Sequence, residues 1–293
     1  MNATTVGALL ATPAIVGAAL IGPAHDLAPL AAGDHQLRDY ALTADALVMI
    51  PAMNQDWLDL TDKLYLQPNG FPSSGTVNWL PVPETEDLNA SLSGAEQDVI
   101  KAVETDWNSG DFSAKDPLYI FGYSQAAVAA GMAEETLHNY GIPSDALHFV
   151  MVGDSAAQGG FLSEVMPTVL SWFPESWRAD VTTFADDIFK MLNINDAFGL
   201  TTPDNYFQTD IYTLSGDGFA NWDGGANVLG MFSDHLTYLG LTPQEISGAT
   251  LETGAGFSND LTNYYMIDSD DVNMFQSLAN SFDMILGGVL AWF

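Results

Sequence analysis

The sequence contains no cysteine. This absence excludes disulfide bonds, a cysteine nucleophile and cysteine-ligated metal sites. It does not indicate a compartment, because an exported protein can lack disulfides. Any nucleophilic chemistry must therefore come from other side chains.

Basic residues are also scarce. The 293 residues include 6 Lys and Arg against 38 Asp and Glu, which gives a formal net charge of -32. A field of this sign repels nucleic acid and anionic membrane surfaces. We therefore expect neither as a partner. The acidity also suits a protein that stays soluble in salt, where charge repulsion is screened.

The N-terminal segment has no Lys or Arg before Arg38, so it lacks the basic start of a secretory signal. Residues 6–22 are nonetheless apolar, and 22–24 could end a signal peptide. We expect residues 1–24 to be a signal peptide or its remnant, and the protein to be exported. The alternative is a helix packed on the domain. The apolar C-terminal run 284–293 is too short to span a membrane and predicts a docked helix.

Apolar residues make up 47% of the chain, enough for a sizeable core. Short apolar runs predict buried strands at 46–51, 117–122, 147–153 and 211–215, with a further short strand at 76–80. Helical patterns cover 54–66, 93–107, 125–140 and about 226–239, and Ser93 with Glu96 forms a capping-box pattern. Strands alternating with helices predict an α/β fold with a mainly parallel sheet, in one domain over residues 25–293.

The stretch 155–208 interrupts this alternation. It is rich in aromatic residues, which lie on amphipathic helical patterns: Trp172, Phe173, Trp177, Phe184, Phe189 and Phe198. We expect a helical lid or cap inserted between two core strands.

The strongest chemical signal is Gly122-Tyr123-Ser124-Gln125-Ala126, between a predicted strand and a predicted helix. The tight strand–turn–helix of an α/β-hydrolase presents its serine nucleophile in the pattern G-x-S-x-G. Here Ala126 takes the place of the last glycine. The pattern predicts Ser124 as the nucleophile of an α/β-hydrolase fold. The alternative is that Ser124 only caps the helix.

A serine nucleophile needs a general base, and histidine is the usual one. Of the five histidines, only His235 follows the last predicted core strand, where this fold places its base. The others are expected to be structural or exposed: His25, His35, His138 and His148. The alternative for His235 is a helix histidine paired with Asp234.

The acid of the triad should follow a core strand. Asp217 does so between two glycines, 93 residues after Ser124 and 18 before His235. Asp154 also ends a strand and competes for the role, with Asp223 and Asp234 as lesser rivals. We favour Asp217, and we expect Asp154 to cap the turn that opens the lid.

Two N–H donors should form an oxyanion hole for the developing negative charge. One is expected at Gln125, directly after the nucleophile. The other is expected from the loop after the first strand, at Met53 or Asn54. The sequence has no metal-ligand spacing, no P-loop and no dinucleotide-binding pattern. No metal or cofactor is expected.

These residues resemble the PE-PPE domain family of mycobacterial and related actinobacterial serine hydrolases, relatives of the cutinases. The resemblance covers most of the chain after residue 45. It rests on the order of several pieces: 47–55 with 64–68, Gly122 to Ala126, 152–154 with 159–160, 212–214 with 217–220, 235–238 with 241–242, and 264–267. It implies an α/β-hydrolase fold, activity on carboxylic esters, and Ser124, Asp217 and His235 as the triad.

The resemblance leaves three functions open. The first is an esterase or lipase-like hydrolase that acts on acyl esters or lipids. The second is an acyltransferase that moves acyl groups onto envelope glycolipids. The third is a non-catalytic envelope protein on a hydrolase fold. No feature of the sequence separates the first two.

Overall fold

A computed structural model describes residues 45–50, 55–83, 87–179, 182–183, 197–253, 257 and 261–281. Several predicted features lie outside these residues: the signal segment 1–24, the oxyanion candidates Met53 and Asn54, and the C-terminal run 284–293. The described part contains no helix that is both long enough and apolar enough to cross a membrane.

Seven strands form one sheet in the order β2-β1-β3-β4-β5-β7-β6. Their bounds are β1 Asp45–Met49, β2 Thr76–Trp79, β3 Leu118–Tyr123, β4 Leu147–Val152, β5 Gln208–Leu214, β6 Thr250–Leu251 and β7 Thr262–Ile267. Neighbouring strands pair in parallel, except β6 with β7. The mainly parallel sheet of an α/β-hydrolase fold is therefore confirmed.

The five predicted strands are all present. Two further strands, β6 and β7, were not predicted. β7 buries only part of its side chains, so Thr262 to Ile267 lacks the continuous apolar run of a central strand. β7 pairs with β5 on one side and with β6 on the other, and these contacts between distant parts of the chain are not visible in its local sequence.

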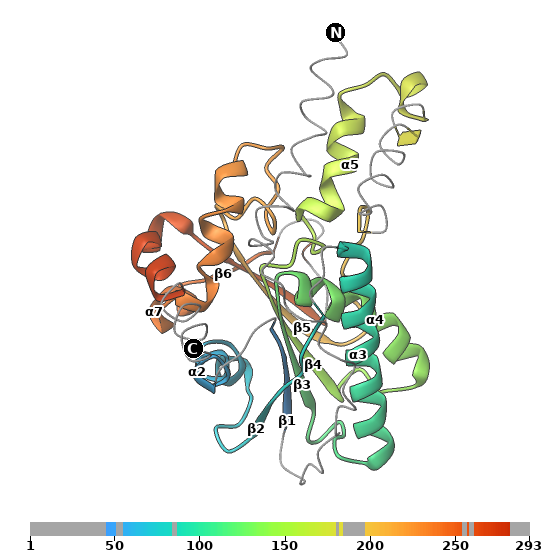
Figure 1. Cartoon of the computed structure of the whole chain (residues 1–293), viewed down its shortest axis with the longest axis vertical. Coiled ribbons are helices and arrows are strands. Elements are labelled where there is room, and N and C mark those ends of the chain that lie inside the picture. Colours follow the sequence, from blue (N-terminus) through green and yellow to red (C-terminus); the bar gives the residue numbers. More distant parts are fainter. Residues whose placement is uncertain are drawn as a thin grey trace.

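Helices cover both faces of the sheet (Figure 1). Helices α3 (Leu88–Ser109) and α4 (Gln125–Tyr140) pack on one face. The other face carries α2 (Gln55–Thr61), which continues as a π-helical turn over Asp62–Leu66, and α7 (Pro243–Ser247). Side chains of a strand alternate between the two apolar layers.

The predicted start of α3 was wrong. The helix begins at Leu88, and the Asp87 carboxylate caps it by accepting a hydrogen bond of 3.0 Å from Ala90 N–H. Ser93 lies inside the helix, so the capping-box pattern with Glu96 does not mark its end. Both residue types occur within helices as well as at caps, and Asp87 offers an equally good cap six residues earlier.

The predicted helix over 226–239 was also wrong. This stretch consists of three short 3-10 turns, over Val228–Met231, Asp234–Leu236 and Tyr238–Gly240. Gly230 packs so closely on the chain that a Cβ there would lie 1.7 Å from the Gly216 carbonyl oxygen. The segment packs against the loop after β5, and this close contact requires short turns with a glycine at position 230 in place of a continuous helix.

The stretch between β4 and β5 opens with α5 (Phe161–Ser171), which extends away from the sheet in Figure 1. The root of α5 is buried through Phe161, Leu162, Val165 and Val169. The far end carries exposed aromatic side chains at Trp172 and Trp177. The predicted lid begins with an anchored helix, and much of its remainder lies outside the described residues.

Candidate active site

Ser124 stands in a sharp turn between β3 and α4. Its φ is 57° and its ψ -123°, and it is the one residue other than glycine with a positive φ in the described part of the chain. Such a conformation costs about 1–3 kcal/mol and persists where surrounding packing enforces it. The turn thus holds Ser124 in a strained backbone conformation, which is the conformation expected for the serine of a nucleophile elbow.

Close packing explains the small residues around this turn. A Cβ on Gly122 would lie 2.7 Å from the Cα of Ala127, so no side chain fits there. Ala126, by contrast, is buried with its methyl group accommodated among the apolar residues between α4 and the sheet. The elbow therefore requires glycine before the serine and tolerates alanine after it.

The side chain of Ser124 faces His235. Its Oγ lies 2.7 Å from His235 Nε2, and it makes no capping hydrogen bond to α4. The alternative of a helix-capping serine is therefore wrong. Ser124 as a residue is only partly buried.

The other ring nitrogen of His235 faces Asp217. Nδ1 lies 2.8 Å from Asp217 Oδ2, and both side chains are buried. Oδ1 of Asp217 accepts a hydrogen bond of 2.9 Å from the Phe219 N–H. The structure thus brings together Ser124, His235 and Asp217 in one hydrogen-bonded line.

The glycines beside Asp217 are required for close approach. A Cβ on Gly216 would lie 2.0 Å from Asp234 Oδ2, and one on Gly218 would lie 2.5 Å from the Asn227 carbonyl oxygen. Neither has the positive φ that favours glycine. Their small size lets the acid's loop pack against the histidine's segment.

Asp154 has other partners. Its Oδ1 accepts from the Ala156 N–H over 2.9 Å and its Oδ2 from the Thr202 hydroxyl over 2.6 Å. Burial raises its pKa from 3.8 to about 6. It caps the turn that opens the 155–208 stretch, which is the role predicted for it.

The remaining candidates lie elsewhere. His148 pairs with Asp210 over 2.6 Å, and the ring of His138 stacks beside Tyr206. Asp223 is exposed, and Asp234 accepts a hydrogen bond from Ser233. His25 and His35 lie outside the described residues. The pairing of His235 with Asp234 considered from the sequence is therefore wrong.

Gln125 is the first residue of α4. N–H groups in the first turn of a helix have no acceptor within the helix, and the helix dipole adds positive potential there. The Gln125 N–H is thus available as one oxyanion donor. The other two candidates, Met53 and Asn54, lie outside the described residues. Within the described part, no group of His, Asp and Glu is placed to hold a metal ion.

Three tyrosines surround the line of three residues, and we call them the tyrosine frame: the buried Tyr65 and Tyr238 and the partly buried Tyr123. Tyr123 donates its hydroxyl to the backbone carbonyl of His235, and Tyr65 donates to that of Tyr238 over 2.7 Å. Tyr238 donates to Asp217 Oδ2 over 2.8 Å. No sequence motif marks these tyrosines, because their partners lie far away along the chain; the one local signal is that Tyr238 follows His235 by three residues.

Aromatic rings connect this site to the root of α5. The Phe219 ring lies 4.8 Å from the His235 ring, between ring centres. Phe161 contacts Phe219 at 6.2 Å and Trp222 at 5.1 Å. The start of the predicted lid therefore packs on the loop that carries Asp217.

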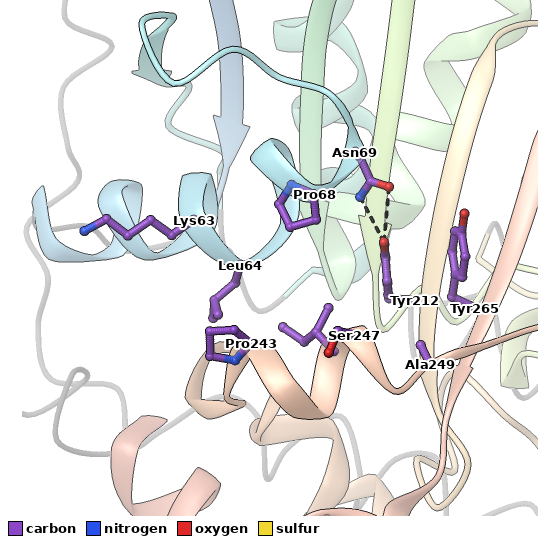
Figure 2. Close-up of a pocket in the computed structure, with 10 residues that line it drawn as sticks. Lys63, Leu64, Pro68, Asn69, Tyr212, Pro243, Ser247, Ala249 and Tyr265 are labelled. Atoms are coloured by element: carbon purple, nitrogen blue, oxygen red, sulfur yellow. Dashed lines mark hydrogen bonds between the residues drawn. The ribbon is translucent and has the colours of Figure 1, made fainter.

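A pocket of about 250 Å³ opens on the sheet face covered by α2 and α7, and Ser124 is not among its lining residues. Figure 2 shows the Asn69 amide hydrogen-bonded to the Tyr212 hydroxyl, with Tyr265 beside them. The rings of Tyr212 and Tyr265 stack at 4.8 Å. Tyr212 also contacts Tyr65, so this pocket borders the tyrosine frame.

A model of the PE-PPE domain matches residues 71–281, which include the elbow and all three aligned side chains. This chain belongs to the PE-PPE domain family. The match covers well over half of the sequence, and the resemblance seen in the motifs is thereby confirmed.

One relative of this PE-PPE protein carries the name of an esterase. It is 27% identical over 182 residues to Esterase PE16 of Mycobacterium tuberculosis (strain ATCC 25618 / H37Rv), a match that covers 57% of this chain and 30% of that protein. The chain thus spans less than a third of that relative's length.

Two similar solved structures are hydrolases. One is olei00960 from Oleispira antarctica, with 12% identity, coverage of 86% of this chain and 91% of that one, and a TM-score of 0.36. The other is an α/β serine hydrolase without lid from Xanthomonas campestris, with 10% identity, coverage of 87% and 85%, and a TM-score of 0.36.

Proposed function

We propose that this protein is a serine hydrolase that cleaves carboxylic esters of acyl chains through an acyl-enzyme. Ser124 is the nucleophile, His235 the general base and Asp217 the acid. The proposal is supported by the hydrogen-bonded line of these three side chains, by membership of the PE-PPE domain family and by the esterase name of a relative.

The first half of the reaction forms the acyl-enzyme. With Nδ1–H donated to Asp217, His235 Nε2 is the free acceptor that takes the hydroxyl proton as Ser124 Oγ attacks the ester carbonyl. The carbonyl oxygen gains negative charge, which the Gln125 N–H and the positive end of α4 stabilise. The second oxyanion donor is proposed at Met53 or Asn54. The intermediate collapses when His235 gives its proton to the departing alcohol.

The second half releases the acid. A water molecule gives a proton to His235 and attacks the acyl-enzyme, and the same donors stabilise the second intermediate. Ser124 Oγ regains its proton, and the carboxylic acid leaves. Asp217 keeps the imidazole in the required tautomer and stabilises it while it is protonated.

The single observation that carries the proposal is the 2.7 Å approach of Ser124 Oγ to His235 Nε2 in a turn strained around the serine. The test is a panel of p-nitrophenyl esters from short to long chains, on the wild type and Ser124→Ala, with labelling by a fluorophosphonate probe. We expect labelling and turnover in the wild type only, with turnover lost by several orders of magnitude. Activity of Ser124→Ala within about tenfold of the wild type would contradict the assignment.

The same assay separates hydrolysis from acyl transfer. A long-chain alcohol is added as acceptor, and the ratio of acid to new ester is measured at fixed ester concentration. We expect acid as the main product, which is the product of an esterase. A product that is mostly ester would assign the same machinery to an acyltransferase. Export stays part of the proposal and is tested by N-terminal sequencing of the protein recovered from culture medium.

A further inference from the structure

The carboxylate of Asp217 has two more hydrogen-bond partners than the line of three residues requires. It is fully buried, and its Oδ2 receives both His235 Nδ1 and the Tyr238 hydroxyl, each at 2.8 Å. Oδ1 receives the Phe219 N–H. Three hydrogen-bond donors thus converge on one buried carboxylate, two of them on the same oxygen.

We propose that Tyr238 is a positioning residue of this site: its hydroxyl holds the Asp217 carboxylate aligned and draws negative charge away from His235, and thereby lowers the pH at which His235 takes up a proton. This inference rests on the proposed function. The reason lies in the shared oxygen. A second donor on Oδ2 withdraws electron density from the carboxylate, so Asp217 stabilises a positive charge on the imidazole less strongly.

The direction of the Tyr238 hydrogen bond is fixed by its other partner. The hydroxyl oxygen accepts a hydrogen bond of 2.8 Å from the Leu214 N–H, the last residue of β5. An N–H can only donate, so the hydroxyl proton is free to point at Asp217. Burial raises the pKa of Tyr238 well above 10, and Tyr238 therefore stays protonated as a donor at neutral pH.

The same contacts position the whole group. The Asp217 N–H donates to the Leu214 carbonyl over 3.0 Å, and the Leu214 N–H donates to the Tyr238 hydroxyl. Leu214 therefore bonds both Asp217 and Tyr238. The Tyr238 ring stands edge-on to the His235 ring at 6.2 Å. A Cβ on Gly153 would lie 3.0 Å from the Tyr238 ring, so the residue directly after β4 closes the space on that side. Tyr238 therefore links β5, the acid and the base.

The other titratable groups near His235 act elsewhere. Among the described residues, the ring faces Asp217, Tyr123 and Tyr238, with Ser124 on its second nitrogen. The Tyr123 hydroxyl bonds the backbone carbonyl of His235 and not the ring. Asp234 bonds Ser233. Tyr238 is thus the neighbour whose hydroxyl acts on the charge of the His235–Asp217 pair.

The test uses Tyr238→Phe with Tyr65→Phe as matched control. Tyr65 is as deeply buried and also donates one hydroxyl bond, but to a backbone carbonyl. For Tyr238→Phe we expect the acid limb of kcat/KM against pH to move up by about one unit, with kcat down about tenfold at neutral pH and KM within threefold. Tyr65→Phe should leave the limb in place. An acid limb at the same pH in Tyr238→Phe and in the wild type would overturn the inference.

A second substitution covers the case in which Tyr238→Phe does not fold. Tyr238→3-fluorotyrosine keeps the ring and strengthens the donor, so the acid limb should move to lower pH. An unchanged limb, or one that moves up, would overturn the inference.

A measurement without substrate separates this inference from the proposed function. The imidazole of His235 is titrated by NMR in a Ser124→Ala background, with and without Tyr238→Phe, and assigned by a His235→Gln spectrum. We expect the midpoint to rise in Tyr238→Phe. If no ester is cleaved and no probe is bound, the proposed function fails, while this titration still decides the role of Tyr238.

Discussion

The Thr202 hydroxyl donates a hydrogen bond of 2.6 Å to the buried Asp154 Oδ2, across 48 residues of sequence. This bond joins the two ends of the stretch between β4 and β5. It is supported by the Thr202 N–H, which donates to the Ala156 carbonyl over 2.9 Å. Asp154 therefore closes the base of the predicted lid, while Asp217 faces His235.

Exchanging each acid for its amide distinguishes these two roles. We expect Asp217→Asn to cut kcat by about three to four orders of magnitude, because the amide favours the wrong tautomer of His235. Asp154→Asn should keep kcat within about threefold, since an amide can still bond Ala156 and Thr202. Both variants are assayed on one short-chain ester after circular dichroism has shown that they are folded. A folded Asp154→Asn that loses more turnover than Asp217→Asn would make Asp154 the acid.

A second prediction concerns the outer part of the 155–208 stretch. Its base, including Phe161 and Thr202, is packed into the core and must be kept. We expect replacement of residues 172–196 by a short Gly/Ser loop to raise KM for long-chain esters at least tenfold more than for short ones, because apolar side chains line acyl pockets. The measurement compares KM for C4 and C12 p-nitrophenyl esters in the variant and the wild type.

The matched control is Trp79→Ala, an exposed tryptophan on the edge strand β2. This substitution should change KM for the C4 and C12 esters by the same factor. An equal loss for both esters in the loop variant would show that the outer part does not bind the acyl chain.

The sequence predicted the central strands and the elbow because both depend on local patterns. Apolar runs mark buried strands, and Gly122 with Ser124 marks a turn whose geometry only small neighbours permit. It could not predict the start of α3, since Asp87 and Ser93 are equally good caps and the choice depends on packing. The partners of Asp217 were likewise hidden, because Tyr238 reaches it only through the 3-10 turns after β5.

Ser124 should also limit stability. Its left-handed backbone is strained with a side chain and relaxed with glycine. We expect Ser124→Gly to unfold with a free energy about 1 kcal/mol higher than Ser124→Ala, although both variants are inactive. Urea denaturation measures the difference, and Ser113→Gly against Ser113→Ala on an exposed loop is the control pair. A Ser124→Gly protein less stable than Ser124→Ala would show that the turn stores no strain.

The last prediction concerns pH. Burial raises the pKa of Asp154 and of Asp106 from 3.8 to about 6. Burial also raises that of Glu134 well above 4.5, and neither Glu134 carboxylate oxygen has a hydrogen-bond partner in the described part of the chain. Each of these groups binds its proton more tightly in the folded state than in the unfolded state. Their contribution to stability is therefore complete below about pH 4, and the part from Asp154 and Asp106 is lost as the pH rises through about 6.

We accordingly expect the free energy of unfolding to fall between pH 5 and pH 7.5, by roughly 2–4 kcal/mol if two such groups ionise. The net charge of -32 acts in the same direction, because repulsion grows as carboxyls ionise. Urea denaturation at constant ionic strength measures the fall. Glu134→Gln stays neutral at both pH values, so its fall should be smaller than that of the wild type. The exposed Glu135→Gln removes the same charge without burial and serves as control. A stability that rises towards pH 7.5, or equal slopes for both variants, would show that the buried carboxyls do not control the pH response.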